Sequence, residues 1–492
     1  MVKDFGGFSF LFLSLDSDIA WLIFAAYDQA QLLLTFIVIY LLFTIMLGVW
    51  ASRRVHSSGD FMLAGRSLPI VLSTTALFAT WFGSETVFGA SSEFLEGGLY
   101  ATIEDPFGAS LCLLLFGLFF ARKLYQMNLL TLGDYFKVRF GRKAELTFSA
   151  LMIPSYFGYT AGQLVALGLI LNVVTGLPIW QGVVISSFIV TLYTMAGGMW
   201  AVSITDFVQS IIIIIGLVVL AVVLAAKAGG VMTVLKEVPK ENFRFLPALR
   251  PSEIISYMAA WSVLGLGSIP SQDVFQRVMS SGSPNVAVRS CYYASIMYLT
   301  IALIPLFISL CVKHLYPEQV EGDLQLVLPR MVMTQTGLGL QVLFFGSLLS
   351  AVMSTTSSSI LAPAAVLSEN IVKPLLKAKP TDRQLLLLTR TSVLLISIIA
   401  TVMACWRTNI YELVAGASIL SLVSQFIPLT MGLYWTKANG TGAIISMVGG
   451  MVTWGIFELY PIEIPSMVPA LAVGFVSIIA GSILTRKEFS QV

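Results

Sequence analysis

The stretch Ala351-Val352-Met353-Ser354-Thr355-Thr356-Ser357-Ser358-Ser359 lies inside an apolar segment that runs from about 338 to 367. The segment is long enough to cross a bilayer, yet six consecutive hydroxyl side chains make a poor surface toward lipid. Helical spacing places Ser354, Ser357 and Ser358 on one face. Hydroxyl and carbonyl oxygens without a strong base suit a small hard cation such as Na⁺ better than zinc or copper. The alternative interpretation is that these small residues only let two helices pack closely.

The whole chain has the composition of a membrane protein. Of its 492 residues, 57% are hydrophobic and 11% are charged, whereas soluble domains carry about 25% charged residues. Segments of about 20 apolar residues recur from end to end, which predicts an all-α polytopic protein forming one transmembrane domain over residues 1–492. Hydropathy places about thirteen crossings, with errors of several residues at each end. They lie at roughly 30–50, 69–92, 99–122, 146–173, 177–196, 200–226, 252–275, 287–313, 338–367, 385–405, 411–435, 441–459 and 465–485.

Two of these crossings contain residues that interrupt helices. The crossing at 69–92 carries Gly83–Thr86 in its middle, and the crossing at 252–275 carries Gly265–Pro270. Each opens a block of five crossings, repeat one at about 69–226 and repeat two at about 252–435, with an extra helix before them and the helices at 441–485 after them. Interrupted segments at matching places in two halves predict an inverted-repeat transporter. Two kinked helices in an ordinary bundle are the alternative.

The loops predict the orientation in the membrane. Most lysines and arginines follow the first, third, seventh, ninth, eleventh and thirteenth crossings, whereas acidic residues such as Glu93, Asp105 and Asp323 collect on the opposite side. The positive-inside rule then places the N-terminus outside and the C-terminus in the cytoplasm of a plasma or inner membrane.

Charged and aromatic side chains near the interruptions are candidates for function. A carboxylate inside a membrane costs several kcal/mol unless it is partnered, which singles out Asp206 and Glu85. A ring face can hold an organic cation, and Trp81 borders the first interruption. Gln163 and Gln272, with Glu85, could hydrogen-bond an amine or an amide. Structural interpretations remain beside these: Asp206 as a helix cap, Glu85 as a brace for unwound backbone, and the rings as packing.

Five pieces of the sequence, in order, resemble the sodium/solute symporter family. They are Asp60–Arg66, Thr131–Phe136 with Arg139–Gly141, Tyr193–Gly198 leading into Thr205, Asp206 and Gln209, Gln276–Arg277, and Ala351–Thr355. Within that family, Ala79–Trp81, Ile269–Pro270 and Phe275–Val278 are most similar to high-affinity choline transporters. The resemblance covers almost the whole chain and implies the leucine-transporter-like fold of two inverted five-helix repeats with broken first helices.

The resemblance also implies site residues. The central Na⁺ site of the family corresponds to Ala79, Phe82, Ala351, Ser354 and Thr355. A further Na⁺ site, present in some members, corresponds to Asp206, Ser354, Ser357 and Ser358. Choline carriers hold the quaternary ammonium in a tryptophan cage, of which Trp81 matches one member, while Tyr159 and Ser271 stand at the other two positions.

The sequence therefore predicts a sodium-coupled symporter that imports a small organic solute by alternating access. The solute is a choline-like amine, an amino acid or a related metabolite, Na⁺ is the coupling ion, and the bilayer is the surrounding partner, with no nucleic acid. A proton-coupled carrier that uses Asp206 or Glu85, and a nutrient sensor built on a transporter fold, are the alternatives. An enzyme is not expected, because the sequence offers no nucleophile–base pair or metal cluster.

Overall fold

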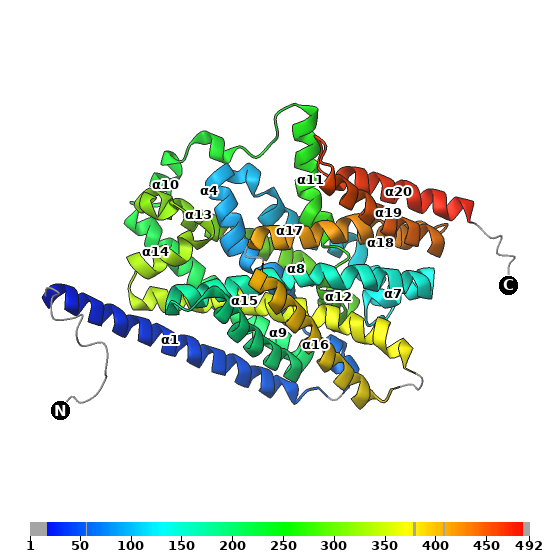
Figure 1. The fold of residues 1–492 in the computed structure, drawn as a ribbon, viewed down its shortest axis with the longest axis horizontal. Coiled ribbons are helices and arrows are strands. Elements are labelled where there is room, and N and C mark those ends of the chain that lie inside the picture. Colours follow the sequence, from blue (N-terminus) through cyan, green and yellow to red (C-terminus); the bar gives the residue numbers. More distant parts are fainter. Residues whose placement is uncertain (1–16, 56, 377–379, 407–408, 486–492) are drawn as a thin grey trace.

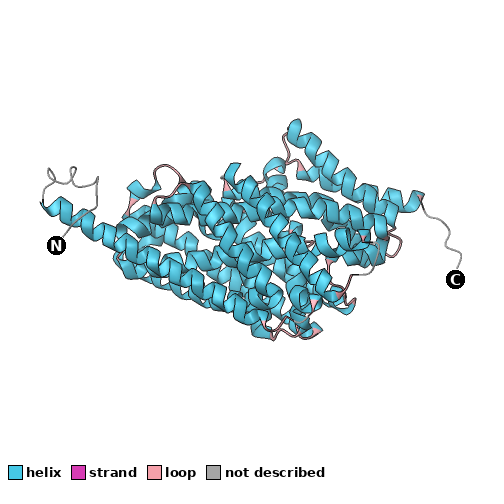
Figure 2. Cartoon of the chain, turned by 60° about the horizontal axis from the view of Figure 1, so that its bottom comes forward, coloured by secondary structure: helices cyan, strands magenta, loops and turns pink. Residues whose placement is uncertain are grey.

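The computed structural model describes residues 17–55, 57–376, 380–406 and 409–485, and this part of the chain consists of helices joined by short loops (Figure 2). The α-helices are α1 (Ser17–Ser52), α2 (Ser58–Leu63), α3 (Ile70–Trp81), α4 (Ala90–Ala101), α5 (Ala109–Leu115), α6 (Ala121–Gln126), α7 (Leu132–Phe140), α8 (Arg142–Thr175), α9 (Ile179–Lys227), α10 (Val231–Glu237), α11 (Pro251–Gly267), α12 (Gln272–Ser280), α13 (Pro284–Leu315), α14 (Val327–Gln335), α15 (Leu338–Val366), α16 (Asp382–Trp406), α17 (Ile410–Ser421), α18 (Ile427–Tyr434), α19 (Gly440–Leu459) and α20 (Met467–Leu484). Short 3₁₀ or π turns are η1 (Ala64–Arg66), η2 (Glu85–Gly89), η3 (Ile103–Gly108), η4 (Phe116–Phe120), η5 (Lys240–Phe243), η6 (Pro317–Val320), η7 (Leu324–Leu326), η8 (Leu367–Val372), η9 (Lys373–Leu375) and η10 (Leu422–Phe426).

Ten helical stretches of the described chain are long and apolar enough to span a membrane, or eleven if the bent pair α11–α12 counts as one crossing. The outer face of α1 carries exposed apolar side chains such as Phe36, Ile39 and Met46, as a lipid-facing surface requires. The chain is therefore a multi-pass helical membrane protein. The count of thirteen crossings, the repeat boundaries and the orientation of the termini stay predictions.

The sequence predicts two crossings at 177–196 and 200–226, and the 49 residues of α9 form two helical segments that meet at a kink between these ranges. As one straight helix at 1.5 Å per residue, 49 residues would extend about 73 Å, roughly twice what one bilayer needs, so the length also fits two crossings. Helix α9 bends at Gly198, where φ is 51° and ψ is −144°. A side chain could not stand there, because its Cβ would lie 2.4 Å from the carbonyl oxygen of Phe61.

Helix α15, which holds the serine-rich stretch, lies at the centre of the bundle. Every residue from 347 to 366 is buried, and the helix packs against α9, α8, α16, α12 and α3. Helix α1 lies along one edge of the molecule, and α19 and α20 lie at the opposite edge (Figure 1). A helix that is buried on all sides must satisfy its hydroxyl groups within the protein, so its neighbours decide what those hydroxyls can bind.

The two interrupted crossings differ in form. The first is broken after α3: Phe82 has φ −74° and ψ 77°, and the chain resumes as the π turn η2. The second bends by 47° between α11 and α12. Both interruptions predicted from glycine and polar residues are therefore present.

Candidate functional site

The break after α3 frees three carbonyl oxygens, and side chains of three other helices bind them. The Ala79 carbonyl oxygen accepts a hydrogen bond from Thr355 of α15 at 3.2 Å and lies 3.3 Å from the hydroxyl oxygen of Ser354. The Thr80 carbonyl accepts a hydrogen bond from the Tyr159 hydroxyl of α8 at 2.9 Å, and the Trp81 carbonyl oxygen lies 3.2 Å from the Tyr298 hydroxyl of α13. Unwound backbone inside a membrane is stable only with such partners.

The residues predicted for the central Na⁺ site meet at this break. Besides the contacts with Ala79, Thr355 Oγ1 lies 3.2 Å from the carbonyl oxygen of Ala351. Phe82 borders the same small apolar cavity as Ala351. Gly83 packs closely against the site, because a Cβ added there would lie only 2.8 Å from Thr355 Oγ1. The donor set consists of neutral oxygens, which suits a hard cation such as Na⁺.

The residues predicted for a second Na⁺ site also meet, but around an arginine. A terminal nitrogen of Arg277 lies 3.1 Å from Oδ2 of Asp206 and donates to Ser358 as well, and Ser354 donates to the other carboxylate oxygen. Ser357 instead donates to the backbone of Ser354 at 2.8 Å. Arg277 and Asp206 are 1% and 0% exposed, so the guanidinium supplies the positive charge at this carboxylate.

Sequence reasoning quoted Arg277 only as part of a motif and missed this role. The signal was present, because an arginine in a membrane crossing requires a counter-charge and Asp206 is one of few available.

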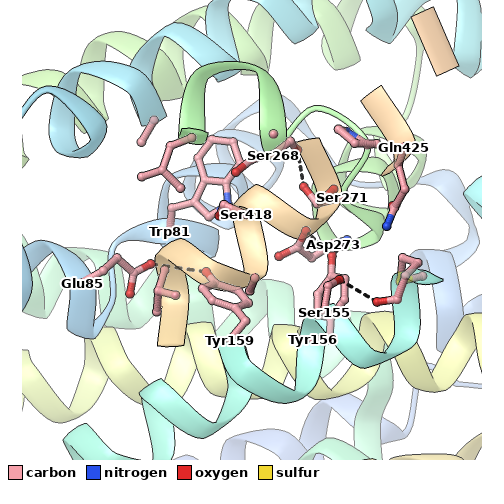
Figure 3. A pocket seen from close by; sticks show the side chains of 18 of the residues that line it. Trp81, Glu85, Ser155, Tyr156, Tyr159, Ser268, Ser271, Asp273, Ser418 and Gln425 are labelled. Atoms are coloured by element: carbon pink, nitrogen blue, oxygen red, sulfur yellow. Dashed lines mark hydrogen bonds between the residues drawn. The ribbon is translucent and has the colours of Figure 1, made fainter. Parts of the chain in front are cut away.

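A cavity of about 50 Å³ lies between the two interrupted crossings, α8 and the α17–η10 segment (Figure 3). Four aromatic side chains and two carboxyl groups line it, together with small and hydroxyl side chains. The lining residues are Trp81, Glu85, Ala109, Met152, Ser155, Tyr156, Tyr159, Leu264, Gly267, Ser268, Pro270, Ser271, Asp273, Tyr298, Val414, Ala417, Ser418, Ser421 and Gln425.

Glu85 is held at one end of the cavity by Gln163 and Tyr159. Gln163 Nε2 donates to Glu85 Oε2 at 2.7 Å, and its Oε1 accepts the backbone N–H of Ser84 at 3.0 Å. The Tyr159 hydroxyl lies 3.4 Å from Glu85 Oε1 (Figure 3). Gln163 does not itself line the cavity; it positions Glu85 against the break.

The other predicted substrate residues separate into two groups. Trp81, Tyr159 and Ser271 line the cavity, and the Ser271 hydroxyl donates to the carbonyl of Ser268. Gln272 does not line it: its Oε1 accepts the backbone N–H of Leu132 at 2.8 Å and joins α12 to α7. The turn at Ser271 rotates the next side chain away from the cavity, which corrects the predicted position of Gln272.

Asp273 and Gln425 are among the polar residues of the cavity wall that sequence reasoning missed. Asp273 Oδ1 accepts a hydrogen bond from the Tyr156 hydroxyl at 2.8 Å. Gln425 is fully buried, and neither atom of its amide group has a hydrogen-bond partner among the described residues. Unpaired buried amides are costly, which marks Gln425 as a group that a bound molecule can satisfy.

Comparison with known proteins identifies the family and the fold of the chain. The model of the sodium:solute symporter family matches residues 61–450. The chain is 28% identical to a high affinity choline transporter of Homo sapiens over 448 residues, covering 86% of this chain and 77% of that one. It is 27% identical to a high-affinity proline transporter of Bacillus subtilis over 480 residues, covering 91% and 97%. The solved structure of a Na⁺-coupled sialic acid symporter superposes with a TM-score of 0.82 at 18% identity, covering 92% of this chain and 98% of that one.

Proposed function

We propose that the solute carried by this member of the sodium:solute symporter family is an organic cation of the choline class. The chain belongs to that family, has the leucine-transporter-like fold and imports a small solute together with Na⁺. The lining of the central cavity is the observation that carries this proposal. Four aromatic rings and the carboxyl groups of Glu85 and Asp273 face it, and none of the described lining residues is a lysine or an arginine.

The lining suits an ammonium group in two ways. A ring face attracts a desolvated cation by about 0.5–2 kcal/mol, and Trp81 is the best ring for this purpose. A carboxylate adds a charge-assisted attraction that a neutral sugar would not use. An amino acid would bring a carboxylate of its own, which Glu85 and Asp273 would repel.

Gln425 gives the cavity a second kind of recognition. Its unpaired amide can accept a hydrogen bond from a hydroxyl group through Oε1 or donate one to it through Nε2. A choline-like molecule carries both groups, an ammonium and a hydroxyl, and so matches the acidic and aromatic wall and the amide together.

We propose that Na⁺ binds among Ala79, Phe82, Ala351, Ser354 and Thr355 and joins the broken crossing to α15. Holding the break in place would shape the cavity beside Trp81, so ion and substrate would favour the same conformation. One Na⁺ moving down about 100 mV releases roughly 2.3 kcal/mol. A tenfold gradient adds about 1.4 kcal/mol, so that one ion supports an accumulation of several hundredfold.

We propose further that Arg277 stands in for a second ion in this conformation. Its guanidinium already contacts Asp206 and Ser358. Na⁺ could use Asp206, Ser354, Ser357 and Ser358 only after Arg277 has moved, which makes the stoichiometry depend on this side chain.

The proposal is tested by thermal melting of the purified chain with and without Na⁺, against choline, betaine, amino acids, sugars and carboxylates. Choline should raise the melting temperature, and should do so more in Na⁺ than in K⁺, because a ligand that binds the folded state stabilises it. Stabilisation by a neutral sugar or by a carboxylate, with no response to any ammonium compound, would exclude the organic-cation proposal. Uptake into proteoliposomes should follow the same order.

A further inference from the structure

Four oxygen atoms meet at the break in α3, directly behind the cavity wall. The Tyr298 hydroxyl lies 2.7 Å from Oδ1 of Asp105, 2.7 Å from Oγ1 of Thr86 and 3.2 Å from the carbonyl oxygen of Trp81. Thr86 Oγ1 lies 3.2 Å from that same carbonyl. Asp105 is 2% exposed, and Thr86 and Tyr298 are fully buried. We call these four groups the Asp105 cluster.

The cluster lacks positive charge when Asp105 is ionised. The Tyr298 and Thr86 hydroxyls carry one hydrogen each, and the Tyr298 hydroxyl lies 2.7 Å from Oδ1 of the carboxylate. Oδ2 of Asp105 is buried without a hydrogen-bond partner among the described residues. No lysine or arginine of the described chain forms an ion pair with it. A buried carboxylate in this state costs several kcal/mol, so it requires a compensating cation.

A proton fits the geometry of the cluster. The oxygen–oxygen distances are those of hydrogen bonds, so a shared hydrogen fits between neighbouring oxygens. A proton on Oδ1 of Asp105 supplies a third hydrogen. Asp105 can then donate to Tyr298, Tyr298 to Thr86 and Thr86 to the Trp81 carbonyl, so that three of the four contacts carry a hydrogen, against two when Asp105 is ionised.

The cluster also borders the substrate cavity. Trp81 and Tyr298 line the cavity with their rings and contribute their carbonyl and hydroxyl oxygens to the cluster. A cation beside Glu85 and Tyr298 would therefore lie one side chain away from the Asp105 carboxyl group.

From this arrangement we infer that Asp105 exchanges one compensating charge for another: it holds a proton while the cavity is empty and releases it when a cationic substrate binds. On release the O–H bond of Asp105 breaks, the electron pair stays on the carboxylate, and the proton leaves to water. The inference rests on the proposed organic cation as substrate. It adds a linked proton to sodium-coupled import.

One titratable group contacts Asp105 directly, Tyr298 of α13, and Glu85 of η2 lies on the cavity that Tyr298 also lines. Titratable groups on the elements packed against η3 include Tyr100 and Tyr257, which stack on each other, and Glu253, which pairs with Arg244. Glu93 and Glu96 line a separate cavity, Cys112 is buried in α5, and Cys291 of α13 contacts the Ala287 carbonyl.

Infrared spectroscopy of the purified full-length chain tests the first half of the inference without any substrate. The wild type should show the carbonyl absorption of a protonated carboxylic acid, and Asp105→Asn should lack that band. Identical carboxylic-acid bands in the two proteins would overturn the proton assignment. If Asp105→Asn does not fold, Tyr298→Phe should shift the same band, because it removes the hydrogen-bond partner of Asp105.

A choline titration in weakly buffered solution with a pH indicator tests the second half. The wild type should release about one proton more per bound choline than Asp105→Asn, and its choline affinity should fall by up to about tenfold per pH unit on acidification. Ser110→Ala is the matched control, since Ser110 pairs with Ser295 of the same helix α13 at 2.9 Å, outside the cluster. It should release as many protons as the wild type.

Equal proton release from the wild type and Asp105→Asn would overturn the exchange. A loss of Na⁺ affinity in Asp105→Asn, with unchanged proton release, would overturn it as well and identify Na⁺ as the compensating ion. If the wild type does not bind choline at all, the proposed function fails, and the infrared comparison still decides whether Asp105 holds a proton.

Discussion

Gly83 is the residue at which the ion site and the substrate cavity can be disturbed by a single methyl group. A Cβ added to it would lie 2.7 Å from Gln163 Oε1, 2.8 Å from Thr355 Oγ1 and 3.0 Å from Glu85 Oε2. Ordinary carbon–oxygen contacts are several tenths of an ångström longer, so Gly83→Ala must push all three groups away. Overpacking of this kind costs about 1–3 kcal/mol.

We expect Gly83→Ala to lower the binding affinities of both ligands, Na⁺ and the substrate. Thr355 would move off the Na⁺ site, and Gln163 would no longer hold Glu85 against the cavity. Na⁺ and substrate affinities should each fall by about 5- to 150-fold, the equivalent of 1–3 kcal/mol. Binding isotherms for Na⁺ and for choline, each at a saturating concentration of the other ligand, measure the two losses separately.

Gly346→Ala on α15 is the control, because a Cβ at Gly346 would meet no atom within 4 Å. It should leave both affinities unchanged. The reasoning is refuted if Gly83→Ala binds both ligands like the wild type, or if it weakens choline while the Na⁺ affinity stays the same.

Four further changes test separate parts of the site. Thr355→Ala should raise the Na⁺ concentration needed for half-maximal uptake at least tenfold, since it removes a proposed ligand; unchanged Na⁺ dependence in proteoliposomes would refute that assignment. Arg277→Ala leaves Asp206 buried and unpaired and should destabilise the fold by about 3–5 kcal/mol, with partial rescue by Asp206→Asn in the double variant; melting temperatures that fall equally in both would argue against the pair. Gln425→Leu should reduce the preference for choline over tetramethylammonium by about 1–3 kcal/mol, measured as the ratio of inhibition constants; a constant ratio would exclude a hydroxyl contact. Trp81→Leu should weaken choline binding while the melting temperature without ligand stays close to that of the wild type, and a variant that binds normally would remove Trp81 from the site.

Residues with a strong local signature were predicted from the sequence. Gly83 and its polar neighbours indicated a break inside an apolar crossing, and the hydroxyls around Ser354 indicated a buried, oxygen-rich helix. Both features rest on chemistry that a bilayer does not tolerate in an ordinary helix. Their meeting at the Ala79 carbonyl was expected from the family resemblance, and the structure shows that contact.

Features that depend on side-chain direction could not be predicted in this way. Gln272 is predicted in the substrate site because its amide could hydrogen-bond an amine or an amide, but its Oε1 accepts the backbone N–H of Leu132 in α7. Asp105 was assigned to a loop charge, although it pairs with Tyr298 on a helix 193 residues further along the chain. Such contacts depend on how the crossings pack against one another, and no short-range sequence pattern predicts that packing.

Arg277 contacts three other helices at once. Its Nε donates to the Ala76 carbonyl at 2.8 Å, and its other contacts reach Asp206 and Ser358, so one side chain of α12 joins α3, α9 and α15. The planar fork of a guanidinium can serve three directions at once, whereas an ammonium group is a single point of charge. When one half of the transporter moves relative to the other, α3, α9 and α15 must either move together with α12 or lose their contacts with Arg277. If these contacts break, the energy needed to break them would limit the turnover rate of the carrier.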